Sequence, residues 1–241
     1  MAVTHPRPAA EPVPAPSGRI RLGPPPLESG DRLTRAEFER RYEQHPEIKT
    51  AELIEGSVRV ASPVRHELHA KPHSILNWWV TAYWMATPGA EAGDNATVRL
   101  DRENEFQPDI LLRIDHSKGG ASLVAADGYL EGPPELVIEV AASTASYDLH
   151  QKLRVYQRNG VREYIVAQAF ERRVDWFILR DGVFEPLQPD ERGVLRSEAF
   201  PGLWLKASAL WEGDLAAILA ALQEGLASPE HSAFVDQLNA V

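Results

Sequence analysis

The sequence contains no cysteine among its 241 residues. This absence excludes disulfide bonds, thiol nucleophiles, and zinc or iron–sulfur sites that depend on cysteine ligands. It is also consistent with a protein that is located in a reducing compartment, and we expect a cytoplasmic protein.

Long hydrophobic runs are also missing. No stretch approaches the roughly 18 uninterrupted apolar residues of a membrane span, and the N-terminus lacks the apolar segment of a secretory signal. We therefore expect a soluble protein that has no membrane partner.

An excess of positive charge is the third absence, because 25 Lys and Arg face 35 Asp and Glu for a net charge of -10. Proteins that hold long stretches of duplex DNA usually carry a basic footprint. This argues against a large DNA interface but not against a local one. The central part of the chain is more basic than the rest, through Lys152, Arg154, Arg158, Arg162, Arg172 and Arg173.

A hydrophobic content of 44% is enough for one good core, so the chain fits one domain with appendages. Residues 1–30 are rich in proline and alanine and predict a flexible arm. Residues 31–211 form the expected main domain. Residues 212–241 are expected to form a C-terminal helical appendage, with amphipathic helices over 214–226 and 229–238.

The order of expected elements is mixed α/β. Thr34 predicts a helix cap, with Glu37 completing a capping box, and Glu55-Gly56 predicts a hairpin turn. Pro72 fits the first turn of a helix rich in tryptophan. The expected elements are helices over 34–44 and 72–88, a helix that begins about ten residues after Glu139 and ends at Asn159-Gly160, a hairpin over 51–58, and strands near 97–100, 109–114, 135–141, 163–167 and 174–179.

Two acidic residues stand where a buried strand would carry apolar side chains. Asp109 opens the run Ile110 to Ile114, and Glu139 interrupts Leu136 to Ala142. A buried carboxylate without compensation costs several kcal/mol, so such groups are paired, hydrogen-bonded, protonated or bound to metal. An internal ion pair is the plain alternative for Glu139, and turn chemistry is the plain alternative for Asp109.

A helix follows Glu139, with Ser143 to Ser146 as candidate N-caps and Asn159-Gly160 as its expected end. Asp148, Lys152 and Tyr156 recur every four residues along the edge of its apolar stripe. This spacing brings Lys152 toward the strand that carries Glu139.

These residues in this order resemble the Uma-two family of restriction endonucleases, within the PD-(D/E)XK nuclease superfamily. The resemblance runs from about Leu33 to Trp211, and it includes Pro108-Asp109, the strand of Glu139, and Gly160 to Tyr164. It also includes the Glu52 to Gly56 hairpin and the segment Phe200 to Leu203. The resemblance implies that residues 31–211 form a restriction-endonuclease-like core, with a central mixed sheet flanked by helices.

The resemblance also implies a site. Asp109, Glu139 and Glu52 would be metal ligands, and Lys152 would be the catalytic lysine, displaced to a helix from the usual position, which is Ala141 here. His69, Tyr156 and Asp148 are secondary candidates. A solvated strand-edge carboxylate is the plain alternative for Glu52.

The implied activity is that of an endonuclease that hydrolyses DNA phosphodiester bonds through a metal-activated water. Mg²⁺ suits carboxylate oxygens, and Mn²⁺ is a possible substitute. A homodimer is expected, because cutting both strands of a duplex is easiest with two sites.

Two other interpretations remain open at this point. One is a catalytically inactive nuclease-fold module for nucleic-acid or protein interaction. The other is a zinc enzyme that uses His66, His69 and His73, which are spaced by three and four residues. Pro72 argues against zinc, because it predicts that His66 and His69 lie in a loop before the helix.

Overall fold

The computed structural model describes residues 23–142 and 148–240, so the predicted N-caps at 143–146 lie outside the described residues. Its longer helices are α1 (Arg35–Gln44), α2 (Lys71–Met85), α4 (Leu153–Asn159), α5 (Ala207–Glu212), α6 (Leu215–Leu226) and α7 (Pro229–Ala240). Shorter helical turns are η1 (His66–Ala70), η2 (His116–Lys118) and η3 (Asp148–Lys152). Among these described helices, none has the length and apolar character needed to cross a membrane.

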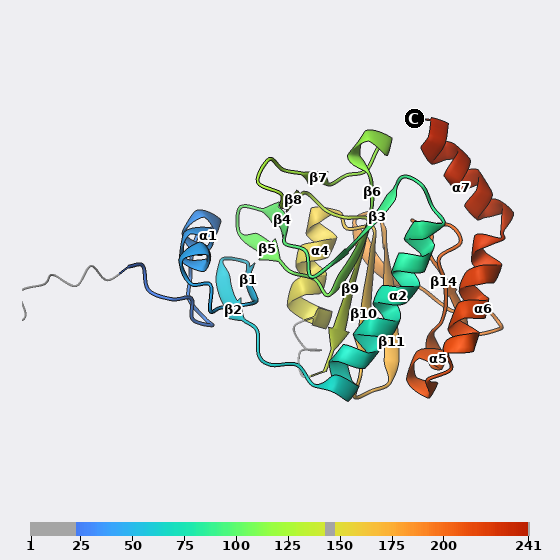
Figure 1. The fold of residues 1–241 in the computed structure, drawn as a ribbon, viewed down its shortest axis with the longest axis horizontal. Helices are drawn as coiled ribbons and strands as arrows, with labels where there is room; N and C mark the ends of the chain where they lie inside the picture. The colour runs from blue at the N-terminus through green and yellow to red at the C-terminus, as the bar shows by residue number, and fades with distance from the viewer. Residues whose placement is uncertain (1–22, 143–147, 241) are drawn as a thin grey trace, which may run out of the picture.

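The larger sheet forms the centre of the molecule (Figure 1). Its strand order is β12 (Val183–Pro186), β11 (Arg173–Arg180), β10 (Glu163–Gln168), β9 (Leu136–Ala141), β6 (Ile110–Ile114) and β3 (Ala90–Asp94). β9 and β10 are parallel, and the other neighbours are antiparallel. The predicted mixed sheet is therefore confirmed.

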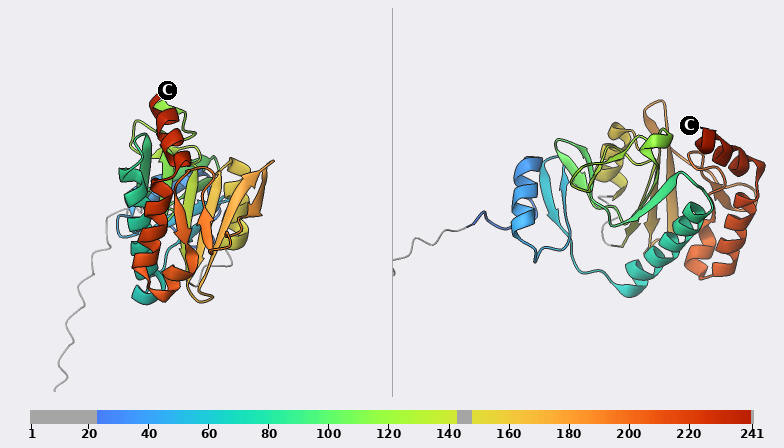
Figure 2. Two further views of the ribbon diagram at one scale, coloured as in Figure 1. Left: turned by 90° about the vertical axis from the view of Figure 1, so that its right-hand side faces the viewer. Right: turned by 45° about the horizontal axis from the view of Figure 1, so that its top comes forward.

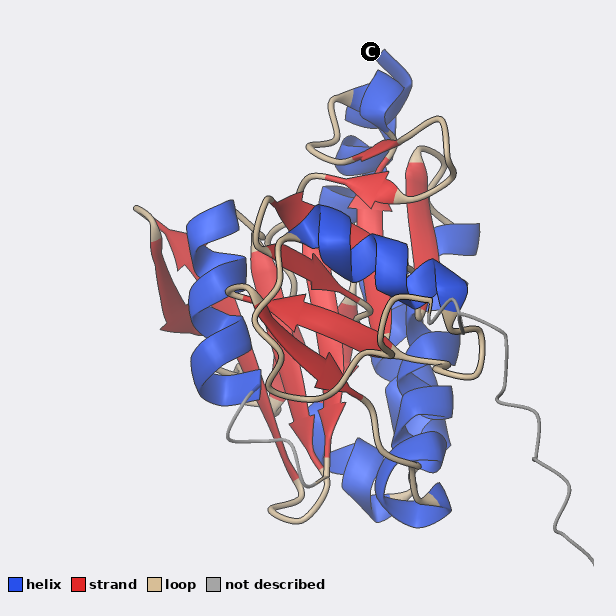
Figure 3. Cartoon of the chain, turned by 90° about the vertical axis from the view of Figure 1, so that its left-hand side faces the viewer, coloured by secondary structure: helices blue, strands red, loops and turns tan. Residues whose placement is uncertain are grey.

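Helices cover both faces of this sheet (Figures 2 and 3). Leu136, Ile138 and Val140 of β9 enter the core that also contains the buried side of α2 and residues of α5, α6 and α7. Val137 and Ala141 enter the core beneath α4 on the opposite face. The strand is buried on both faces, which explains its almost continuous apolar sequence.

A second sheet and α1 form an N-terminal lobe beside the main sheet (Figure 1). Its strand order is β2 (Ser57–Val60), β1 (Ala51–Ile54), β5 (Asn104–Phe106), β4 (Val98–Asp101), β8 (Leu130–Glu131) and β7 (Leu123–Val124). A separate pair joins β13 (Val194–Arg196) to β14 (Trp204–Lys206). Leu27 is buried with Phe38 and Leu53 in the core of the lobe, so the last part of the predicted arm packs against the hairpin.

Local signals account for the ends of several elements. Thr34 accepts a hydrogen bond from the backbone N–H of Glu37 at 3.4 Å, as a cap should. The Glu37 side chain instead binds Arg40 and Arg41, so the capping interaction uses one of its two expected bonds. Glu55 and Gly56 adopt positive φ angles of 49° and 72°, which form the predicted turn.

The segment before α2 differs from expectation. His66 and His69 do not lie in an open loop, because residues 66–70 form a π-helical turn continuous with α2. The backbone N–H groups of His69 and Ala70 both donate to the Arg65 carbonyl, at 2.9 and 3.2 Å. Pro72 still occupies the first turn of α2, but because this turn follows another helical turn, Pro72 leaves one backbone hydrogen bond unmade.

The C-terminal helices pack on the main core through Ile218, Leu222 and Leu238. Gly225 of α6 approaches residue 202 so closely that a Cβ at position 225 would lie 2.2 Å from the Gly202 carbonyl oxygen.

The buried Glu163 carboxylate binds the segment 197–199, which precedes β14. Its Oε1 accepts from the backbone N–H groups of Glu198 and Ala199 at 2.7 and 2.8 Å. Its other oxygen accepts from the Ser197 hydroxyl and the Trp176 indole at 2.7 and 3.2 Å.

The N-terminal lobe contains a group of charges outside the predicted site. Arg99 Nε lies 2.9 Å from Glu39 Oε1 and 3.7 Å from Glu105 Oε2. Among the described residues, none of these three atoms has a partner with the geometry of a hydrogen bond. Burial of Glu105 and its contact with Glu39 raise the pKa of Glu105 to about 8, while Arg99 acts in the opposite direction. Within this group, Glu105 therefore keeps its proton to a higher pH than an ordinary carboxyl.

Candidate active site

Glu139 lies at the centre of the candidate site because of strand alternation. It occupies the fourth position of β9, on the same face as Val137 and Ala141 and beneath α4. The residue is 5% exposed. Its carboxylate is therefore removed from solvent and requires a compensating partner.

Lys152 supplies that partner. Its Nζ lies 2.9 Å from Glu139 Oε1, 3.0 Å from Glu52 Oε1 and 3.8 Å from Asp148 Oδ1. These carboxylates come from β9, β1 and η3, and all four side chains are at most 10% exposed. One ammonium thus joins the main sheet to the N-terminal lobe.

Glu52 reaches this point because β1 also alternates. Leu53 packs into the core of the N-terminal lobe, whereas Ile54 packs into the core beneath α4. Glu52 shares the face of Ile54 and points toward the main sheet. The backbone N–H of Gln107 donates to Glu52 Oε1 at 3.1 Å, and the Tyr156 hydroxyl donates to Glu139 Oε1 at 3.0 Å.

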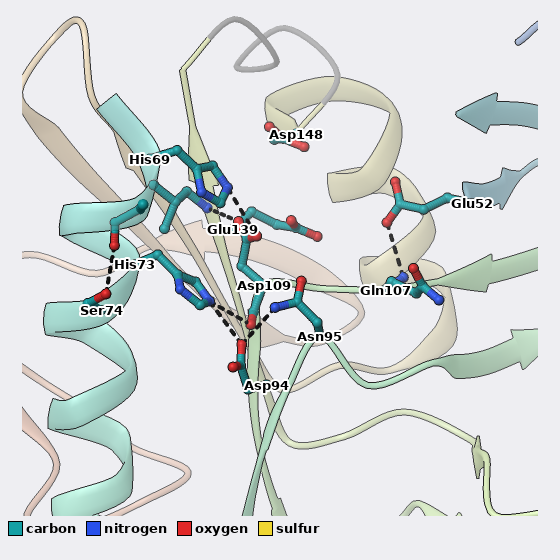
Figure 4. A network of polar contacts seen from close by, with 12 residues as sticks. Glu52, His69, His73, Ser74, Asp94, Asn95, Gln107, Asp109, Glu139 and Asp148 are labelled. Carbon is teal, nitrogen blue, oxygen red and sulfur yellow. Dashed lines mark hydrogen bonds and ion pairs between the residues drawn. The ribbon is translucent and has the colours of Figure 1, made fainter. Parts of the chain in front are cut away.

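Asp109 lies directly before β6 and next to Glu139 in the antiparallel register, because Ile110 pairs with Ile138. Its Oδ2 accepts from the Val140 backbone N–H at 2.7 Å, and its Oδ1 lies 3.1 Å from His69 Nε2. Figure 4 shows His69 beside the Asp109 carboxylate and Glu139, Asp148 and Glu52 around the neighbouring space.

A second histidine supports this side of the site. His73 Nε2 lies 3.1 Å from the Asp109 carbonyl oxygen and 3.0 Å from Asp94 Oδ1 (Figure 4). The His69 and His73 rings stack with 5.8 Å between their centroids. Asn95 donates its side-chain amide to Asp94 at 2.8 Å. These contacts fix both the backbone and the side chain of Asp109.

The electrostatics show that negative charge exceeds positive charge here. Burial raises the pKa of Glu139 well above its ordinary value, Lys152 lowers it, and the carboxylates of Asp148, Asp109 and Glu52 raise it further. Burial acts to lower the pKa of Lys152, but the surrounding carboxylates outweigh burial and raise it, so the lysine is an ammonium. Burial acts to raise the pKa of Asp109, but His69, the Val140 N–H and His73 together outweigh burial and the pKa falls.

The structure therefore brings together every residue that the sequence proposed for the site. Glu52, Glu139, Asp148 and Lys152 are in direct contact, Tyr156 binds Glu139, and Asp109 and His69 lie alongside. The three-histidine alternative is not formed, because His69 and His73 bind carboxylates and the His66 side chain is 79% exposed.

The side chains of the site have the chemistry of ligands for a divalent cation. Four carboxylates (Glu52, Asp109, Glu139 and Asp148) surround one ammonium and one histidine, and carboxylate oxygen is the ligand that Mg²⁺ prefers. In the part of the chain that the structure describes, no three His, Asp or Glu side chains already converge as metal ligands do. Lys152 instead lies between Glu52 and Glu139.

Four contributors were missed in the sequence. Gln107 acts through its backbone N–H, which any residue except proline provides, so its identity gave no signal. Asp94 and Asn95 lie at the end of a short polar strand, and only the pairing of β3 with β6 brings them to Asp109. His73 was considered only as a zinc ligand.

Comparisons with known proteins agree with this arrangement. The sequence model of the Uma2 family, described as "Putative restriction endonuclease", matches residues 35–208. A crystal structure from Anabaena variabilis, described as "a putative nuclease belonging to DUF820", is similar with a TM-score of 0.55 and 16% sequence identity. The similarity covers 75% of this chain and 98% of that chain. No curated protein matches the sequence.

Proposed function

Because the chain belongs to the Uma2 family of restriction-endonuclease-like proteins, we propose that it is a Mg²⁺-dependent endonuclease that hydrolyses phosphodiester bonds in DNA. The observation that carries the proposal is the buried group of Glu52, Glu139 and Lys152, drawn from two sheets and one helix. A stable core does not require such a group, because well-packed apolar residues would usually serve as well.

Asp109, Glu139 and Glu52 would hold the ion, and Mn²⁺ would be a possible substitute. When bound, Mg²⁺ would activate a water molecule and neutralise charge that builds on the phosphate. Burial, together with the neighbouring carboxylates, raises the pKa of Glu139, and a bound cation would favour its ionised form.

The protein's own groups have distinct tasks in this proposal. The Lys152 ammonium orients the attacking water or donates to a phosphate oxygen as its charge increases. Tyr156 keeps the Glu139 carboxylate in place, and His69 and the Val140 N–H do the same for Asp109. The bond formed joins the water oxygen to phosphorus, and the bond broken joins phosphorus to the leaving oxygen of the sugar.

The test is a calorimetric titration with Mg²⁺, together with plasmid nicking by the same samples. Wild type is compared with Asp109→Ala/Glu139→Ala and with Glu43→Ala/Glu230→Ala, a control that removes two exposed carboxylates from α1 and α7. We expect binding and nicking to disappear only in the first double variant. Absence of metal binding by the wild type would refute the proposal and favour an interaction module built on a nuclease fold.

A further inference from the structure

One border of the candidate site is basic although the whole chain is acidic. Residues 57–71 comprise β2, a connecting segment and η1, and end at Lys71, the first residue of α2; they carry Arg59, Arg65 and Lys71 against a single carboxylate, Glu67. The net charge of the whole chain is -10. Figure 1 shows this segment running from the N-terminal lobe to the start of α2.

Arg59 faces the candidate site. It pairs directly with Glu52 in the antiparallel register of β1 and β2, and directly opposed residues project from the same face. The neighbouring Val58 projects from the other face, where it is buried with Leu53. Arg59 therefore lies on the side of the hairpin from which Glu52 contacts Lys152, and on the edge strand of its sheet.

The Arg59 side chain is partly ordered by its surroundings. The residue is of intermediate exposure, and its Nη1 atom is shielded from solvent. A side chain that is already held in place loses less conformational freedom when it binds a ligand. A planar guanidinium also matches the two oxygens of a phosphate group.

Arg65 borders the site from the other end of the connecting segment. Its carbonyl accepts the backbone N–H of His69, the residue whose ring contacts Asp109. Arg65 is exposed, and among the described residues its side chain has no ion-pair partner. Lys71 contributes less, because Glu67 lies 3.1 Å from it.

We propose that Arg59 and Arg65 form a phosphate-contacting lip, which holds the nucleic-acid backbone at the entrance to the carboxylate site. The proposal rests on the proposed function, because it assigns where the substrate of that site is held. It also accounts for a nucleic-acid substrate in an acidic protein: the two arginines border the site, while charges more than about one Debye length away are screened by salt.

The test is fluorescence anisotropy with a labelled duplex DNA, a single-stranded DNA and an RNA of equal length, in EDTA over a range of salt concentrations. The variants are Arg59→Ala, Arg59→Lys, Arg65→Ala and Arg65→Glu. Arg162→Ala is the matched control, because Arg162 is exposed and immediately precedes β10, four residues before the register partner of Glu139.

Each alanine variant is expected to bind duplex DNA about eightfold more weakly at 0.1 M salt. The plot of log K against log salt should become shallower by about 0.9, which corresponds to the loss of one phosphate contact. Arg59→Lys should lose less than Arg59→Ala, and Arg65→Glu more than Arg65→Ala. The loss should occur with all three nucleic acids, because the contact is with phosphate. Arg162→Ala should bind as wild type does.

Arg65 is exposed, so its variants keep the test valid if Arg59→Ala does not fold. Equal binding by wild type and both Arg65 variants would overturn the proposal, as would an equal loss in Arg162→Ala. Binding is measured without metal, so its result is separate from nicking. A chain that binds through the lip but never cuts would contradict only the proposed function.

Discussion

Replacing Lys152 with methionine tests whether the buried charges form one interdependent centre. The substitution removes the ammonium but keeps an unbranched side chain of similar length. Nζ contacts Glu139 at 2.9 Å and Glu52 at 3.0 Å, and these side chains are at most 10% exposed, so solvent screens the contacts little. Removing one partner of a buried ion pair costs about 3–5 kcal/mol, because the remaining charge has no compensation. We expect the free energy of unfolding to fall by that amount in EDTA.

The assay is urea denaturation at pH 8, with Lys71→Met as the matched control. Lys71 also forms an ion pair, with Glu67 at 3.1 Å, but the two side chains are 55% and 71% exposed. An exposed pair contributes about 0–1 kcal/mol, so the control should unfold almost as wild type does.

Addition of Mg²⁺ extends the same experiment. A ligand that binds only the folded state stabilises it, and the carboxylates of Lys152→Met lack their ammonium. Mg²⁺ should therefore stabilise the variant more than the wild type and reduce the difference between them. A variant no less stable than the Lys71 control would refute the buried charge centre. A deficit that Mg²⁺ leaves unchanged would refute the assignment of these carboxylates as metal ligands.

Three other substitutions test buried groups outside the candidate site. The pKa of Glu105 is about 8 in the folded chain and about 4.3 in an unfolded one. Between these two pH values the folded state keeps a proton that the unfolded state releases. The contribution of this group to the free energy of unfolding is therefore complete below about pH 4.3 and is lost as pH rises through about 8. Glu105→Gln should therefore match wild type near pH 4.5 and exceed it by about 1–3 kcal/mol at pH 8.5 in urea denaturation; parallel pH profiles would contradict this. Glu163→Gln should reduce the free energy of unfolding by about 1–3 kcal/mol, because an amide N–H₂ would face donors that now meet a carboxylate, whereas Glu171→Gln at an exposed position should change little. Gly225→Ala should lower stability by about 1–3 kcal/mol because its Cβ would meet the Gly202 carbonyl, and an unchanged urea midpoint would show that α6 shifts freely.

Strongly periodic parts of the fold were predictable from the sequence. The spans of α1, α2, α6, β9 and β10 agree with the expected elements within a few residues, because caps and apolar periodicity specify them locally. Strands of the N-terminal lobe such as Asn104–Phe106 and Leu123–Val124 were not expected. They are short, and only pairing with distant strands makes them strands.

The candidate site was predictable for a different reason. Spacing placed Lys152 on a helix face toward Glu139, but the link to Glu52 came from family resemblance. No local pattern shows that β1 turns Glu52 toward the main sheet, since this depends on the packing of Leu53 against Phe38. The roles of these residues in a reaction remain predictions.

The contact between Glu52 and Lys152 joins residues 100 positions apart in the chain. Closing a loop of that length costs about 4 kcal/mol of chain entropy, so this contact forms only after other interactions have brought the two parts together. A nascent chain that has emerged only as far as β8 contains Glu52 and Asp109 but neither Glu139 nor Lys152. The order of synthesis therefore delays assembly of the charged centre until well over half of the polypeptide has been made.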